Sequence, residues 1–152
     1  MTVKKRRAGR FQKKRKRKII SDNKSRFKQG YYRPVNVEKY IPTPNKMSEF
    51  LPFYRSSWEL KFMKYLDKSD DVLRWSSEPF PVEYFSSDDG RVRHYYPDFY
   101  VEFANGKRLI VEIKPASQTN LKRNLEKWDA VQNLCYIKNL DFAVLTEKEL
   151  GV

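Results

Sequence analysis

The chain is poor in the residues that build disulfide frameworks and zinc sites. Its 152 residues include a single cysteine, Cys135, and a single histidine, His94. One cysteine excludes an internal disulfide, and no Cys/His cluster has the spacing of a zinc site. We therefore expect a protein of a reducing compartment such as the cytoplasm.

Long apolar runs are also absent. No segment has the roughly 18 consecutive apolar residues of a membrane-spanning helix, and the basic N-terminus is not followed by the apolar core of a signal peptide. The sequence therefore predicts a soluble protein without a membrane partner. With 10 Phe, 10 Tyr and 3 Trp, it has enough apolar material for the core of one domain of ordinary size.

Acidic residues are nearly missing from the N-terminus. Residues 1–33 hold 15 of the lysines and arginines but one acid, Asp22, so the net charge of +13 resides here. With little to bury, this segment is predicted to be a basic arm, disordered or extended. Its charge favours binding to nucleic acid or a nucleoprotein assembly. A nuclear-localisation signal, a ribosomal-type RNA-binding arm and a membrane-surface patch are alternatives. The DNA-binding residues expected in the arm are Lys4, Lys5, Arg6, Arg7, Arg10, Lys13, Lys14, Arg15, Lys16, Arg17 and Lys18.

The rest of the chain divides into a connector and a folded domain. Residues 34–54 contain four prolines and no sustained period, which predicts an extended connector. Residues 55–152 are expected to form the domain, which is α/β in class (an α+β mixed sheet) with a helix on each face. Its predicted elements are a helix from the Ser56 cap to about Lys68, strands near 72–75, 80–85, 91–103 and 107–114, a helix capped by Thr119, and a strand at 141–146.

The stretch HYYPDFYVEFANGKRLIVEIKP, residues 94–115, predicts a β-hairpin around an Ala-Asn-Gly break. A two-residue Asn-Gly turn would set apolar residues against charged ones. A three-residue loop with Gly106 in the left-handed conformation instead pairs Val101 with Leu109 and Phe99 with Val111. We therefore predict the three-residue loop.

This register places Asp98 opposite Glu112, with Lys114 on the same face beside Glu112. Directly opposed like charges destabilise a hairpin, so the repulsion must be offset. A shared proton, the ammonium group of Lys114 or a divalent metal ion would each do so.

Glu59 is a third acid of interest. It follows Ser56 by three residues, as in a capping box, and it aligns with the apolar stripe of Phe62, Met63 and Leu66. The helix alone does not separate a cap from a site residue, but the acid pair of the hairpin favours the site.

Together, Pro97-Asp98 and Glu112-Ile113-Lys114 resemble the motif of the PD-(D/E)XK nuclease superfamily, over about residues 55–146. The segments RSSWELKFMKYLD and NGKRLIVEIKP are most similar to the head completion nucleases of T-even-like bacteriophages and, more distantly, to transposon end-cleaving nucleases of the TnsA kind. The resemblance implies a restriction-endonuclease-like αβββαβ core and a metal-dependent nuclease.

The resemblance also implies the site residues. Asp98 and Glu112 would bind Mg²⁺ or Mn²⁺, with the carbonyl of Ile113 as a further ligand and Glu59 binding directly or through water. Lys114 would act on the attacking water. Glu59, Asp98, Glu112 and Lys114 are thus the expected catalytic residues.

Other expectations concern the partners of such a nuclease. Arg55 is expected to contact DNA phosphate or the site carboxylates, whereas Tyr95, Tyr96 and Tyr100 are assigned to sheet packing. The resemblance implies double-stranded DNA as substrate and a late step of phage head assembly, with portal or neck proteins as partners. The location would be the host cytoplasm, and also the virion head or neck. A non-catalytic DNA-binding structural protein of the head or neck, and an RNA-binding ribosome-associated protein, are the alternatives.

Overall fold

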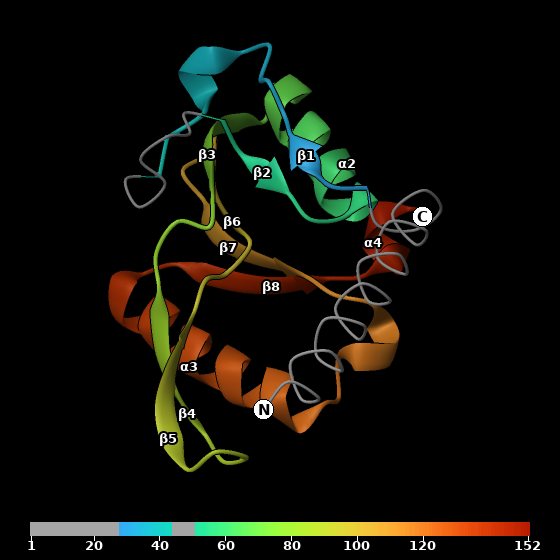
Figure 1. The fold of residues 1–152 in the computed structure, drawn as a ribbon. Helices are drawn as coiled ribbons and strands as arrows, with labels where there is room; N and C mark the ends of the chain where they lie inside the picture. Colours follow the sequence, from blue (N-terminus) through green and yellow to red (C-terminus); the bar gives the residue numbers. More distant parts are fainter. Residues whose placement is uncertain (1–27, 44–50) are drawn as a thin grey trace, which may run out of the picture.

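The computed structural model describes residues 28–43 and 51–152. The predicted DNA-binding residues of the arm, Lys4 to Lys18, lie outside these ranges. Figure 1 shows a central sheet between two layers, with α2 on one side and α3 on the other. The elements are β1 Gly30–Tyr31, η1 Val37–Lys39, β2 Phe53–Tyr54, α2 Ser57–Lys68, β3 Val72–Ser77, β4 Val82–Ser86, β5 Arg91–Tyr95, β6 Phe99–Phe103, β7 Arg108–Ile113, η2 Ala116–Gln118, α3 Lys122–Lys138, β8 Asp141–Leu145 and α4 Glu147–Leu150.

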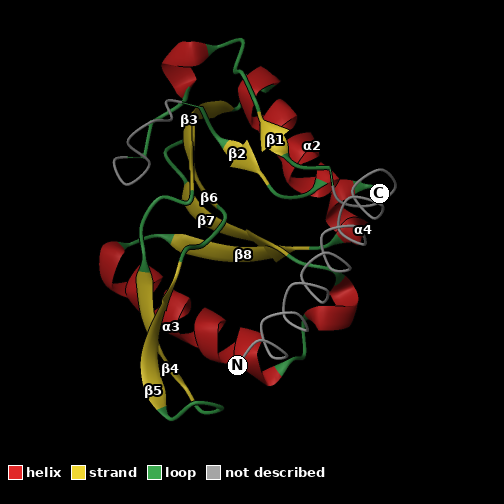
Figure 2. Cartoon of the chain, viewed as in Figure 1, coloured by secondary structure: helices red, strands yellow, loops and turns green. Residues whose placement is uncertain are grey.

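The central sheet is mixed, as predicted. Its strand order is β3-β6-β7-β8, with β6 antiparallel to both β3 and β7, and β8 parallel to β7. A parallel neighbour requires a crossover connection, which α3 provides (Figure 2). Because α3 returns the chain to the start of β8, its N-terminal end lies at the edge of the sheet where β7 ends.

The predicted hairpin register is confirmed. Phe99 pairs with Val111 and Val101 with Leu109 across β6 and β7. Gly106 has a φ of 91°, a conformation that glycine adopts without a steric penalty, and it closes the three-residue loop.

The register divides the core into two parts, one on each face of the sheet. The first packs against α2 and includes Phe99, Val101 and Val111, whereas the second packs against α3 and includes Ile110 and Val131. Alternation along the strands separates the two sets, because successive side chains of a strand point to opposite faces. No helix in the described part of the chain is long and apolar enough to span a membrane.

The strand expected over residues 91–103 is interrupted. β5 pairs with β4 in a separate two-stranded ribbon, and β6 begins only after Tyr96, Pro97 and Asp98. Proline has no N–H for a ladder hydrogen bond, which accounts for the break at Pro97. The chain thus leaves the ribbon after Tyr95, three residues before Asp98.

The second half of the domain also departs from the prediction. Thr119 does not cap α3, since its hydroxyl donates to the carbonyl of Ala116 at 2.7 Å and ends η2. Leu125 of α3 is 49% exposed, whereas Trp128 and Val131 of the same helix are buried. The strand β8 is only partly buried, because it lies at an edge of the sheet.

A buried carboxylate attaches the described part of the connector to α2. Asp67 is fully buried, and its two oxygens accept hydrogen bonds from the hydroxyl of Tyr32 (2.5 Å) and the backbone amides of Val35 (2.8 Å) and Asn36 (2.9 Å). Lys39 donates to the Asp67 carbonyl at 3.0 Å. The carboxylate thereby accepts hydrogen bonds from three donors that lose their hydrogen bonds to water on folding.

We expect Asp67→Asn to lower the free energy of unfolding by about 2 kcal/mol at pH 7, because the amide places an N–H group among hydrogen-bond donors. Burial acts to raise the pKa of Asp67, but the hydrogen bonds from Tyr32, Val35 and Asn36 outweigh it and leave the pKa below its usual value. The carboxylate therefore stabilises the protein above about pH 4, and this contribution is lost as the pH falls through the lowered pKa. Urea denaturation at pH 7 and at pH 3 measures both effects.

The exposed Asp70, at the end of the same helix, provides the control. Asp70→Asn is expected to change the free energy of unfolding by no more than about 0.5 kcal/mol. Equal effects of the two substitutions would contradict the structural role of Asp67.

Candidate active site

Four predicted site residues lie around one end of the central sheet, at the edge formed by the end of β7 and the start of β6. Because β6 and β7 are antiparallel, the residue before β6 and the residue after β7 lie at the same edge. These residues are Asp98 and Lys114, and Glu112 is the second-last residue of β7. Glu59 is in the first turn of α2, and its charge raises the pKa of both Asp98 and Glu112. The fold thus brings the four predicted catalytic residues into one electrostatic environment.

Asp98 is held by backbone on both sides. Its Oδ2 accepts the N–H of Ile113 at 2.7 Å, and its own carbonyl accepts the N–H of Glu78 at 2.8 Å. Burial raises the pKa of Asp98 well above the usual value for aspartate, and the charges of Glu112 and Glu59 raise it further. The hydrogen bond therefore fixes the position of this carboxylate without removing its electrostatic cost.

Glu112 is the most enclosed acid of the site. It is 5% exposed, and its Oε2 is buried without a hydrogen-bond partner among the described residues. Burial raises the pKa of Glu112 to about 7, although the charges of Lys114 and Lys127 act in the opposite direction. A buried carboxylate oxygen without a partner is costly, which indicates that a cation or a proton completes the site.

Glu59 is both a helix cap and a neighbour of the acid pair. Its Oε2 accepts the N–H of Arg55 at 2.9 Å, one residue before the Ser56 amide that a capping box would use. Ser56 fulfils its predicted part, since its hydroxyl accepts the N–H of Glu59 at 3.2 Å. Burial raises the pKa of Glu59, whereas the charge of Lys114 lowers it. The two interpretations of Glu59 from the sequence are therefore compatible.

The Arg55 side chain contacts other residues of the protein. Its guanidinium group forms a salt bridge with Glu78 at 3.2 Å and lies over the ring of Phe53, 5.4 Å from the centroid. The side chain remains 56% exposed, so part of the guanidinium surface is open to a ligand.

Glu78 was missed by the sequence-based prediction. It has a φ of 49°, a left-handed conformation that costs a non-glycine residue about 1 kcal/mol or more. Its amide donates to the carbonyl of Asp98, and its carboxylate binds Arg55. No sequence pattern marks this residue, because both contacts join segments that are distant in the chain.

Lys127 and Tyr95 were also missed. The Lys127 Nζ lies over the rings of Tyr84 and Tyr95, 5.9 Å and 5.6 Å from their centroids. The buried Tyr95 hydroxyl has no hydrogen-bond partner among the described residues, and burial together with the charges of Glu112 and Asp98 raises its pKa. Tyr95 therefore contributes to the surroundings of the acids as well as to packing. Lys127 aligns at helical spacing with Val131 and Cys135, and this pattern could have indicated a lysine directed inward.

The acid pair fits a divalent cation with oxygen ligands. Within residues 28–43 and 51–152, no group of three or more His, Cys, Asp or Glu side chains is arranged to hold a metal ion. Asp98 and Glu112 nevertheless combine mutual repulsion, raised pKa values and an unpartnered buried oxygen, which a bound cation would relieve. Carboxylates are the ligands that Mg²⁺ prefers, and Mg²⁺ commonly takes one or two of them together with water.

Comparison with known proteins identifies the family of the chain. Residues 69–147 match the model of the TnsA-like endonuclease N-terminal family. The chain belongs to this family of nucleases, and the predicted restriction-endonuclease-like fold is confirmed. Nucleases of this family generally use divalent metal ions. A relative is the head completion nuclease of Enterobacteria phage T4, which is 31% identical over 80% of this chain and 92% of its own length.

We expect Glu112→Gln to stabilise the protein. Because the folded state raises the pKa of Glu112 to about 7, its ionisation opposes folding as the pH rises above the value of the unfolded chain. Removing the charge should increase the free energy of unfolding by about 2 kcal/mol at pH 8, and the gain should vanish near pH 4. Urea denaturation in the presence of EDTA at the two pH values measures it.

Glu102 on β6 provides the matched control, since it forms a partly exposed salt bridge with Arg74 at 3.3 Å. Glu102→Gln is expected to leave stability unchanged or to reduce it by less than about 1 kcal/mol. A loss of stability in Glu112→Gln at pH 8 would show that the Glu112 charge is already compensated within the protein.

Proposed function

We propose that the protein is a metal-dependent deoxyribonuclease that hydrolyses phosphodiester bonds of double-stranded DNA with Mg²⁺, or Mn²⁺ in its place. The observation that carries the proposal is the juxtaposition of Asp98 with Glu112 at the sheet edge, with Lys114 directly after β7. Two neighbouring carboxylates beside an ammonium group supply what metal-assisted attack of water on phosphorus requires.

In this proposal Asp98 and Glu112 hold the ion, with the Ile113 carbonyl and Glu59 as further ligands, Glu59 directly or through water. When bound, the ion neutralises charge on the phosphate and lowers the pKa of water. The Ile113 amide keeps the Asp98 carboxylate in place at 2.7 Å before any ligand arrives. Lys114 orients the attacking water and stabilises the negative charge that develops on the phosphate oxygens.

We further propose that DNA is recruited by the basic arm, residues 1–33, through contacts with phosphates. In this arrangement residues 34–54 are the connector and residues 55–152 the nuclease domain. The hydrogen bonds from Tyr32, Val35 and Asn36 to Asp67 support it, because they attach the junction of the arm and the connector to α2. Arg55 would contact a phosphate with the exposed part of its guanidinium group.

The relative's name supports a role in completing phage heads. We propose that this nuclease cuts or trims packaged DNA in the host cytoplasm and so prepares the filled head for tail joining. Portal or neck proteins would be its partners, and the head or neck of the virion would be its final location.

The test of the catalytic proposal is cleavage of linear and circular DNA by purified protein with Mg²⁺. Asp98→Asn and Lys114→Met are each expected to reduce the rate at least 100-fold, because each removes a group that acts at the reacting phosphate. Cleavage of the circular substrate would demonstrate an endonuclease mode. Chelation by EDTA should abolish the activity of the wild type.

Glu102→Gln again serves as the control, since it alters a carboxylate on β6 outside the site and should cleave like the wild type. Full activity of Asp98→Asn would refute the site. Metal-independent DNA binding by a wild type that does not cleave would support a non-catalytic structural protein of the head or neck.

A further inference from the structure

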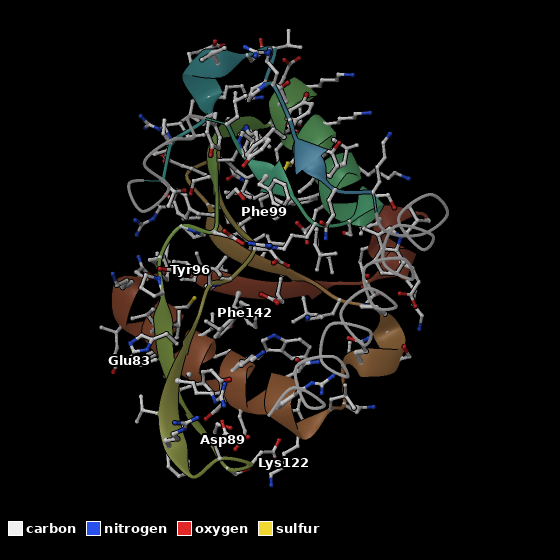
Figure 3. All side chains as sticks on the ribbon, in the orientation of Figure 1. Glu83, Asp89, Tyr96, Phe99, Lys122 and Phe142 are labelled. Atoms are coloured by element: carbon white, nitrogen blue, oxygen red, sulfur yellow. The ribbon has the colours of Figure 1, made fainter. Side chains whose placement is uncertain are left out.

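A group of cations lies beside the acid pair on the α3 side of the sheet. The ribbon of β4 and β5 packs along α3, and the backbone N–H of Ser87 at its turn donates to the Glu126 carboxylate at 3.2 Å. Figure 3 labels Asp89 on this turn and Lys122 at the start of α3, which lie at the same end of the molecule. The ribbon and the N-terminal half of α3 therefore form one wall next to the site.

Lys127 is the innermost cation of this wall. Its side chain is half-buried, and its Nζ lies over the rings of both Tyr84 and Tyr95 at 5.9 Å and 5.6 Å. The faces of the two rings interact favourably with the ammonium charge and restrict its position. A lysine ordered in this way loses less conformational entropy when it binds an anion.

The neighbours of Lys127 are mostly cations. Burial lowers the pKa of Lys127, and the charges of Lys114, Arg123 and Arg93 lower it further, while Glu112 acts in the opposite direction. Among salt bridges between described residues, Arg93 pairs with Asp89, whereas Lys114, Arg123 and Lys127 form none. Like charges held close together repel one another, and a bound anion would reduce that cost.

We propose that Lys127 binds a backbone phosphate of the DNA strand next to the phosphate that is cleaved, and that Arg123 and Arg93 extend this track along α3 and the ribbon. The assignment rests on the proposed function, which places the cleaved phosphate at Asp98, Glu112 and Lys114. A lysine recognises phosphate as a point charge, so this contact positions the strand without reading its sequence.

The alternative is that Lys127 only balances the charge of Glu112. Lys114 already has the larger effect on the pKa of Glu112, and Lys127 the smaller. In the proposed nuclease the Glu112 carboxylate binds the metal ion, which leaves Lys127 with a charge to satisfy. The two roles differ in a measurable way, because only a phosphate contact releases a counter-ion from DNA.

The experiment is a salt titration of DNA binding by the full chain, followed by the fluorescence anisotropy of a labelled duplex in EDTA. For Lys127→Gln we expect about tenfold weaker binding at low salt, and a slope of log affinity against log salt that is shallower by about 0.9. Lys127→Arg should retain the slope of the wild type. Thermal unfolding of each variant verifies that it is folded.

Lys138 is the matched control, because it lies on the same helix with its Nζ over the ring of Phe80, 5.4 Å from the centroid. It is 11 positions further along α3, roughly 16 Å from Lys127 along the axis, at the end remote from the site. Lys138→Gln is expected to keep the salt slope. An unchanged slope in Lys127→Gln, or an equal loss in Lys138→Gln, would overturn the assignment.

Cleavage kinetics separate this proposal from the catalytic one. If both hold, Lys127→Gln raises KM more than it lowers kcat, whereas Lys114→Met lowers kcat. A wild type that cleaves with a KM unaffected by Lys127→Gln would refute the phosphate contact and leave the nuclease intact. A wild type that does not cleave, combined with a shallower salt slope in Lys127→Gln, would refute the nuclease and leave a phosphate-binding site.

Discussion

The repulsion between Asp98 and Glu112 is the constraint on which the rest of the site depends. The two acids meet because the apolar residues of β6 and β7 must share the face packed against α2, and a shift of one residue would turn that face to the opposite side. The hydrophobic core therefore determines the position of two charges that oppose each other. The free energy gained by burying the apolar face of β6 and β7 offsets the repulsion between the two carboxylates at the end of these strands.

Around this pair the protein adds further unfavourable features. Glu78 occupies a left-handed conformation, and its amide holds the carbonyl of Asp98. Burial raises the pKa values of Glu59, Asp98 and Glu112, and the charge of Glu59 raises those of Asp98 and Glu112 further. Strain and raised pKa values concentrated at one sheet edge are typical of a functional site and are not explained by stability.

The sequence was sufficient for the elements whose signals are local. The Ser56 cap, the alternation of β6 and β7 and the Ala-Asn-Gly loop each follow from neighbouring residues, and the structure confirms all three. The separate ribbon, the late start of α3 and the partial exposure of β8 were not predicted. They depend on which strands pair and which edge remains open, and these are properties of the assembled sheet.

The site residues that the sequence did not predict were missed for the same physical reason. Glu78 contributes through a backbone bond to Asp98, and Lys127 through two rings on the ribbon, and neither relation has a signature in the chain. Lys127 and Glu59 nevertheless have a common feature, since each is a charged residue aligned with the apolar stripe of its helix, in the half nearest the acids.

A charged side chain that is aligned with the apolar stripe of its helix can reach the edge of the sheet only where that stripe ends. Helix α2 presents Glu59 there from its first turn, and α3 presents Lys127 from its N-terminal half. The positive end of each helix dipole lies at the same edge, where it favours anions such as phosphate oxygens and ionised carboxylates. The two helices that bury the faces of the sheet therefore also contribute positive dipole ends at this edge.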